Sequence, residues 1–251
     1  MPENVVLLHG FSGTHRAWDG VVARLDQERY LPRALDLPGH GDAADAERPI
    51  RFASCVEHVL ARSPERFVLG GYSLGGRIAL HIALAAPERV SRLVLVSTTA
   101  GIEDASGRAE RSASDHRLAD ELEHGGWAGF DSFIERWRTQ PLFADEPHEV
   151  GALARADQRR NRPDALAAVL RGVGSGEMNP LWEMLPKLTM PVTVPVGDRD
   201  AKFLALGKRM VELLSDAELV IAPGGHGLLL ENPAAVADAL QRIDPEPAGR
   251  R

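Results

Sequence analysis

The run GGYSLGGRIAL, residues 70–80, encloses one serine between glycines, with an apolar stretch before it and a helix-like stretch after it. Its centre, Gly-Tyr-Ser-Leu-Gly at 71–75, matches the G-x-S-x-G pattern of a tight strand-to-helix turn. Such a turn holds its serine in strained backbone geometry, and small flanking glycines avoid clashes at the corner. A plain turn between a strand and a helix is the simpler interpretation. Because both flanking elements are predicted independently, we favour Ser73 as a catalytic group.

Two further residues follow Ser73 in the order that this kind of site requires, first an acid and then a histidine. Asp200 comes after the apolar run PVTVPVG, in GDRDAKF, and Asp198 is the rival acid two residues earlier. His226 lies in GGHG after the run AELVIAP. A histidine between glycines could be only a turn residue. Here it stands where a general base belongs, with Asp200 holding its tautomer.

An oxyanion hole is expected from two backbone N–H groups. One belongs to Leu74, directly after the serine, and the other to Phe11, in the loop His9-Gly10-Phe11 after the first apolar run. For the His9 side chain we prefer a structural role that braces this loop.

Short apolar runs alternate with helical patterns, which indicates an α/β protein with a mostly parallel sheet. From Thr99 to Pro186 no convincing strand occurs, so we expect a helical insertion there. The expected fold is the α/β-hydrolase fold, a mostly parallel sheet flanked by helices with an inserted helical lid. The expected strands lie at 4–10, 30–41, 65–73, 90–98, 189–200 and 217–227, and the expected domains are a core at 1–98 and 187–245, a lid at 99–186 and a flexible tail at 246–251.

Composition narrows the possible partners. A net charge of −7 argues against nucleic acid, and no apolar run is long enough to span a membrane. The single cysteine, Cys55, allows no intramolecular disulfide, and the start MPENVVLLHG does not look like a signal peptide, so we expect a cytoplasmic protein. No His/Asp/Glu cluster has metal-ligand spacing, no cofactor is implied, and a monomer or small homo-oligomer is expected.

The chain from Val5 to Leu240 resembles one branch of the α/β-hydrolases, the 2-succinyl-6-hydroxy-2,4-cyclohexadiene-1-carboxylate synthases of menaquinone biosynthesis. Three runs, LHGFSG, DLPGHG and GYSLGGRIAL, are shared with many α/β-hydrolases. More diagnostic are the lid runs FIERWRTQPLF and NRPDALAAVLRGVGSGEMNPLW, together with GDRDAKF and the arginine of GYSLGGR.

This resemblance implies a lyase that removes pyruvate from an enolpyruvyl-bearing cyclohexene, with Ser73 as a base rather than as a nucleophile. It also implies a small anionic substrate with several carboxylates. The substrate-binding residues that it implies are Tyr72, Arg77, Arg111, Trp137 and, where the match slips by one position, Arg159 or Arg160. For Trp137, ordinary packing in the lid is an equal alternative. For the lid arginines, the alternative is a position on a solvated helix face.

Arg77 is unusual because it lies near the start of a predicted helix, where the helix dipole disfavours a cation. A carboxylate that must dock beside Ser73 would explain it, since arginine binds carboxylates through two hydrogen bonds. A surface pair with Glu88 is an alternative of equal weight. The preference of this chain for arginine, with only three lysines among 29 basic residues, weakens the argument from any one arginine.

The sequence is compatible with two other functions. A carboxylesterase or a carbon–carbon bond hydrolase would use Ser73 as a nucleophile on the same fold. A ligand receptor without catalysis is the other, and the intact set of Ser73, Asp200 and His226 argues against it.

Overall fold

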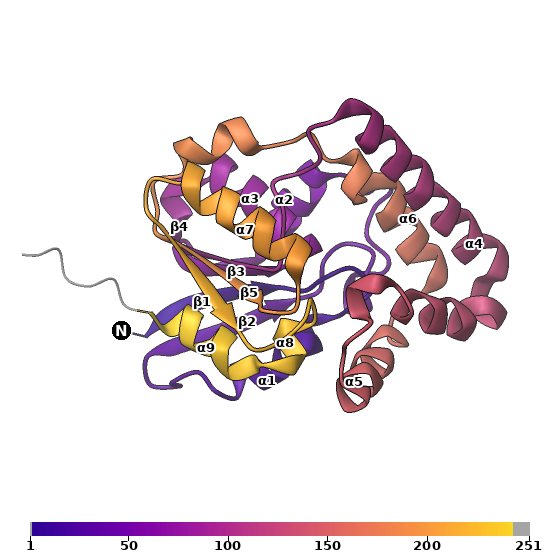
Figure 1. The fold of residues 1–251 in the computed structure, drawn as a ribbon, viewed down its shortest axis with the longest axis horizontal. Helices are drawn as coiled ribbons and strands as arrows, with labels where there is room; N and C mark the ends of the chain where they lie inside the picture. Colours follow the sequence, from indigo (N-terminus) through magenta and orange to yellow (C-terminus); the bar gives the residue numbers. More distant parts are fainter. Residues whose placement is uncertain (1, 243–251) are drawn as a thin grey trace, which may run out of the picture.

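The computed structural model describes residues 2–242, so the expected tail at 246–251 and the last three residues expected for the core lie outside it. Six strands form one parallel sheet in the order β2-β1-β3-β4-β5-β6 (Figure 1). They are β1 (Glu3–Leu8), β2 (Tyr30–Leu35), β3 (Phe67–Tyr72), β4 (Val90–Val96), β5 (Val192–Gly197) and β6 (Ala217–Ala222). Each lies within one of the six expected runs or within a residue of it. The last four residues of β1 and of β4 are buried, continuous apolar runs, which is typical of parallel strands covered on both faces.

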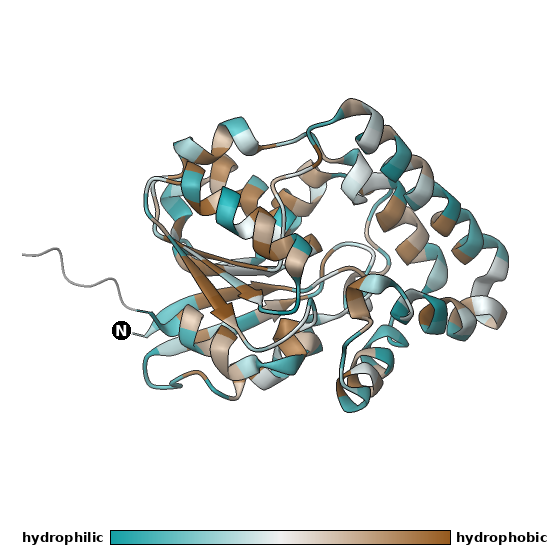
Figure 2. Ribbon diagram, in the orientation of Figure 1, coloured by the Kyte–Doolittle hydropathy of each residue, from teal (hydrophilic) through white to brown (hydrophobic). Residues whose placement is uncertain are grey.

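Helices cover both faces of the sheet (Figure 1). One apolar core joins the sheet to α2 (Phe52–Arg62), α3 (Leu74–Ala85) and α7 (Ala201–Leu213). A second core, which includes Trp18, lies against α8 (Leu228–Glu231), α9 (Pro233–Gln241) and the short α1 (Asp19–Val22). Figure 2 shows the result as hydrophobic strands enclosed between amphipathic helices. None of the helices in residues 2–242 combines the length and the apolar character needed to cross a bilayer.

A long helical region is inserted between β4 and β5. It contains α4 (Ala105–Arg138), α5 (His148–Gln158) and α6 (Pro163–Val173). Gly126 interrupts α4 with a φ of 48°, so that two helices meet at a kink. The apolar faces of α4 and α6 pack on each other, through side chains such as Leu122, Phe133 and Leu166. In Figure 1 this region projects from the carboxyl ends of the strands, which is where open α/β sheets bind ligands.

The helix ends follow local sequence signals. The side chain of Asn232 accepts a hydrogen bond from the N–H of Ala235, and Pro233 takes the first position of α9. An asparagine followed by a proline is itself a sequence signal that predicts a helix start at this point. Asp200 accepts a hydrogen bond from the N–H of Phe203 and so begins α7. The start of α7 therefore fixes a carboxylate at the carboxyl end of β5.

Candidate active site

Ser73 lies at the corner between β3 and α3 with φ 51° and ψ −106°, a backbone conformation that non-glycine residues rarely adopt. The corner leaves no room for side chains at its glycines. A Cβ on Gly75 would come within 2.2 Å of the Leu8 carbonyl oxygen, and one on Gly71 within 2.5 Å of the Gly75 oxygen. A hydrogen bond of 3.0 Å from the Ser73 N–H to the Val96 carbonyl stabilises this strained backbone conformation.

Ser73, His226 and Asp200 form a connected chain of side chains, although 153 residues separate the serine from the histidine. The distance from His226 Nδ1 to Asp200 Oδ2 is 2.8 Å, and that from His226 Nε2 to Ser73 Oγ is 3.3 Å. A carboxylate can only accept, so Nδ1 carries the proton and Nε2 is free to accept the serine proton. His226 and Asp200 are both buried.

The rival acid, Asp198, has a different partner. Its carboxylate accepts a hydrogen bond of 3.0 Å from the N–H of Gly224, and its side chain is half exposed. It therefore braces the loop that carries His226 but does not contact the imidazole. Of the two acids, the structure brings Asp200 to the histidine.

The loop after β1 places Phe11 beside the elbow. Among the described residues, neither the Phe11 N–H nor the Leu74 N–H donates to an acceptor within the chain, so both are available for an oxyanion. His9 holds this loop as expected: its Nδ1 donates to the Gly10 carbonyl at 2.8 Å, and its Nε2 accepts from the Leu37 N–H at 3.0 Å. Burial lowers the pKa of His9, which favours the neutral ring that this pattern needs.

Residues at the end of α5 also hold the oxyanion loop, and the sequence analysis did not identify them. Asp157 accepts hydrogen bonds from the backbone N–H and the hydroxyl of Thr14. Gln158 donates to the Ser12 hydroxyl at 2.8 Å, and Asn161 donates to the Ser12 carbonyl at 2.7 Å. The inserted helices thus support the loop that would stabilise negative charge at the site.

Arg159 and Arg160, the expected substrate-binding arginines of this segment, lie on the opposite, solvent-facing side. Arg159 pairs with Asp131 at 2.7 Å, and Arg160 approaches Asp157 at 3.8 Å. Neither lines the two cavities described below. Asp157 and Gln158 at the end of α5 and Asn161 in the turn after it face the loop after β1, whereas Arg159 and Arg160 between them face solvent.

A sequence model described as the alpha/beta hydrolase family matches residues 5–239. The chain belongs to the alpha/beta hydrolase family.

Within this family the similarity extends over nearly the whole chain. A Salmonella newport protein named 2-succinyl-6-hydroxy-2,4-cyclohexadiene-1-carboxylate synthase is 32% identical over 248 residues, covering 96% of this chain and 93% of that protein. The structure titled MenH from S. aureus superposes with a TM-score of 0.86 at 28% identity, over 94% of this chain and 91% of that one. A hydrolase from Pseudomonas aeruginosa superposes with a TM-score of 0.76 at 25% identity, over 95% and 88% of the two chains.

Phe11, Tyr72 and Trp137 together line an aromatic cavity beside the candidate active site. The Trp137 ring lies 4.9 Å from that of Phe11, and Tyr72 lies 5.5 Å from His226. Trp137 also packs on the apolar core between α4 and α6. Its surroundings therefore include both a cavity, as expected for a substrate-binding residue, and ordinary packing in the lid. Burial raises the pKa of Tyr72, which keeps its hydroxyl protonated.

Arg138 lies in the wall of the same cavity, and the sequence analysis did not single it out. Its side chain is only 9% exposed, pairs with Glu146 and lies over the Phe143 ring at 3.9 Å. Desolvation lowers the pKa of Arg138. A signal was present in the sequence, since Arg138 directly follows Trp137, but adjacent residues of a helix do not normally share a face.

A second cavity has a charged lining of both signs. It includes Arg111 from α4 and Lys202 from α7, together with Asp200 and His226. The other charged residues of the lining are Arg199, Asp145, Glu146 and Glu231, of which Glu231 pairs with Arg199 and Glu146 pairs with Arg138. Arg111 Nε donates to Asp115 Oδ1 at 2.8 Å, and Asp115 is fully buried. The structure therefore places the expected lid arginine next to the triad.

Arg77 is buried, with 7% exposure, and does not pair with Glu88 at the surface. Its Nη1 donates to the Val173 carbonyl, the last of α6, at 2.8 Å, and its guanidinium lies 5.9 Å from the centre of the Phe52 ring. No carboxylate within the described residues lies in ion-pair distance of it. Burial lowers the pKa of Arg77 to about 10, and the nearby charge of Arg111 acts in the same direction. Arg77 does not line either cavity.

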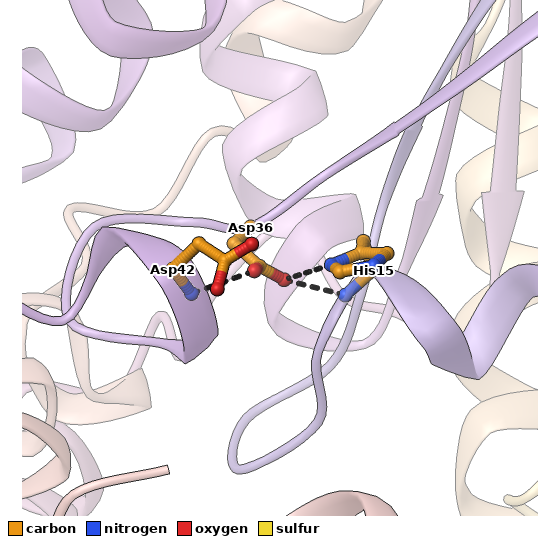
Figure 3. Close-up of side chains that lie close together, drawn as sticks. All are labelled: His15, Asp36 and Asp42. Carbon is orange, nitrogen blue, oxygen red and sulfur yellow. Dashed lines mark hydrogen bonds and ion pairs between the residues drawn. The ribbon is translucent and has the colours of Figure 1, made fainter. Parts of the chain in front are cut away.

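One side-chain cluster departs from the expectation that no His/Asp/Glu group has metal-ligand geometry. His15, Asp36 and Asp42 offer ligand atoms within 4.8 Å of one another (Figure 3). The cluster is not apparent in the sequence, because a strand end and two turns bring together residues that are separated along the chain. Asp36 Oδ1 accepts from the His15 N–H at 2.6 Å and from its ring at 3.0 Å, while Oδ2 accepts from the Asp42 N–H at 2.9 Å. These bonds make Asp36 a brace between two loops.

Proposed function

We propose that this protein eliminates pyruvate from 2-succinyl-5-enolpyruvyl-6-hydroxy-3-cyclohexene-1-carboxylate, giving 2-succinyl-6-hydroxy-2,4-cyclohexadiene-1-carboxylate for menaquinone biosynthesis. The observation that carries the proposal is the cavity that Arg111 and Lys202 line together with His226. Glu231 and Glu146, which also line it, pair with Arg199 and Arg138, so Arg111 and Lys202 are the cations placed to bind substrate carboxylates, which a neutral ester lacks. The name of the Salmonella homologue supports the same reaction.

In the proposed mechanism Ser73 acts as a base. His226 Nε2 accepts the Ser73 proton, and Asp200 stabilises the resulting imidazolium. The serine oxygen removes the proton from the ring carbon that bears the succinyl group. The ring double bond then shifts, and the bond from the ring to the enolpyruvyl oxygen breaks. The departing enolate takes up one proton and becomes pyruvate, so no acyl-enzyme forms.

The N–H groups of Phe11 and Leu74 would stabilise the negative charge on the succinyl ketone oxygen. Such pre-positioned donors contribute several kcal/mol in acyl-transfer enzymes, about 3 kcal/mol for one donor. Because α5 holds the Phe11 loop through Asn161 and Gln158, the inserted helices would support this role. Arg111 would bind a substrate carboxylate, and Tyr72 with Trp137 would contact its apolar ring.

Pyruvate release tests the proposal. The substrate is generated in situ by the enzyme of the preceding step, and pyruvate is followed by coupled oxidation of NADH. We expect wild-type protein to accelerate release well above the uncatalysed control, and Ser73→Ala to lose at least ~10²-fold of that rate. p-Nitrophenyl acetate hydrolysis is measured in parallel. Release at the control rate with rapid ester turnover would instead support the carboxylesterase alternative, in which Ser73 is the nucleophile.

A further inference from the structure

Lys202 occupies a position that is electrostatically unfavourable in the free protein. It lies in the first turn of α7, a 13-residue helix with no acidic residue in that turn, so the helix dipole opposes its charge. It also lines the same cavity as Arg111, which comes from α4, 91 positions earlier in the chain. Two cations from separate elements therefore face one cavity. Arg199 and four carboxylates line it as well, but Glu231 pairs with Arg199 and Glu146 pairs with Arg138, which leaves Lys202 and Arg111 to face the cavity from opposite elements.

No acid of the described chain neutralises Lys202, since no carboxylate lies within ion-pair distance of it in residues 2–242. The pKa of Lys202 is lowered first by burial and next by the charge of Arg111, while Asp200 partly offsets both. Arg111 Nε is held by Asp115, which leaves the terminal nitrogens of the guanidinium available. An anion between the two cations would remove their repulsion.

We propose that Lys202 is a substrate-binding residue that holds, together with Arg111, one carboxylate of the substrate beside His226. This inference rests on the proposed function for the identity of the substrate. The site itself is a place for a carboxylate between an ammonium and a guanidinium. Lys202 thus joins Arg111 as a substrate-binding cation, whereas Arg159 and Arg160, the expected substrate-binding arginines, face solvent.

The chain offers a matched control. Lys208 is also on α7 and is exposed, as Lys202 is, but it lines neither described cavity. Lys202→Gln and Lys208→Gln remove the same charge from the same helix, so a long-range effect of net charge alters both variants alike. Lys202→Arg restores the charge at the site.

Binding is measured by calorimetry with tricarballylate, a small tricarboxylate, and with its neutral trimethyl ester. We expect tricarballylate to bind wild-type protein in a salt-dependent manner and Lys202→Gln to raise its Kd about tenfold, equal to about 1.4 kcal/mol. Lys208→Gln and Lys202→Arg should stay within about threefold of wild type, and the ester should not bind. In the pyruvate assay Lys202→Gln should raise KM with kcat changed less than threefold, because binding is lost rather than chemistry.

The inference fails if wild-type protein does not bind tricarballylate, if both glutamine variants behave alike, or if Lys202→Gln lowers kcat without changing KM. These results are distinguishable from failure of the proposed function. Tricarballylate binding that depends on Lys202, in a protein that releases no pyruvate, would retain the carboxylate site and reject the lyase reaction.

Discussion

Arg77 in α3 donates a hydrogen bond of 2.8 Å to the carbonyl of Val173, the last residue of α6. This contact joins the helix that begins at the candidate catalytic serine to the inserted helical region. The final carbonyls of a helix lack partners within the helix and carry partial negative charge. Arg77 therefore lies at the unfavourable end of its own helix and at the favourable end of another.

This contact predicts a measurable loss of stability. Arg77→Met keeps an extended side chain but leaves the Val173 carbonyl without its donor. We expect the free energy of unfolding to fall by about 1–3 kcal/mol, because a buried acceptor without a partner costs about that amount. Urea unfolding followed by far-UV circular dichroism measures the change. An unaltered urea midpoint would show that the contact contributes no stability. If kcat/KM were nevertheless reduced, the Arg77 charge would act in substrate binding instead.

Asn161 predicts a link between the inserted helices and catalysis. It is fully buried, donates to the Ser12 and Gln158 carbonyls, and accepts from the Gly41 N–H at 3.0 Å. Asn161→Ala should lower the free energy of unfolding by roughly 2–3 kcal/mol and reduce kcat, since the oxyanion loop loses its support.

Arg160, its immediate neighbour, supplies the control. Because Arg160 is exposed and its one ion pair within residues 2–242 is with Asp157 at 3.8 Å, Arg160→Ala should change stability by less than about 0.5 kcal/mol and leave KM near wild type. A large increase in KM would place Arg160 in the substrate site after all and contradict the geometry of α5.

Stability should fall as pH drops below about 6.5, because His9 and His40 are buried and their pKa values are lowered, first by desolvation. The unfolded chain then binds protons that the folded chain does not, and this favours unfolding. The effect is absent above the unfolded pKa of about 6.5 and grows toward the lower folded values. Each histidine should cost at most about 1.4 kcal/mol by pH 5.5 relative to pH 7.5, the limit for a ring that stays neutral in the folded chain.

Urea unfolding at the two pH values measures this dependence, and His40→Gln isolates one contribution. The variant should lose less stability between pH 7.5 and 5.5 than wild type, by about 1.4 kcal/mol. An equal loss in the two proteins would mean that His40 titrates normally in the folded state.

Cys55 should be almost unreactive in the native protein. It is 1% exposed, and burial raises the pKa of its thiol to about 12, against a smaller opposing effect of the Arg77 charge. Since the thiolate is the reactive form, labelling by Ellman's reagent at pH 8 should be on the order of 10³-fold slower than in urea. Rapid labelling of one thiol per chain in native buffer would contradict this burial.

The sequence determined a large part of this protein because some signals are local. The apolar runs predicted all six strands, and Asn232 with Pro233 predicted the start of α9, since caps and hydrophobic periodicity act over a few residues. The G-x-S-x-G run and the order of Ser73, Asp200 and His226 predicted the family, which the match over residues 5–239 confirmed. The roles of individual site residues stay predictions that the experiments above address.

Only the tertiary structure decided which distant groups meet. The contact of Arg77 with Val173 spans 96 positions, and the cluster of His15, Asp36 and Asp42 forms where turns converge. The turn that ends α5 decided that Asn161 faces the oxyanion loop while Arg159 and Arg160 face solvent. The presence of Lys202 and Arg111 in one cavity likewise depends on how the packing places α7 relative to α4. Sequence periodicity specifies the faces of an element, whereas the packing of elements against one another decides what each face meets.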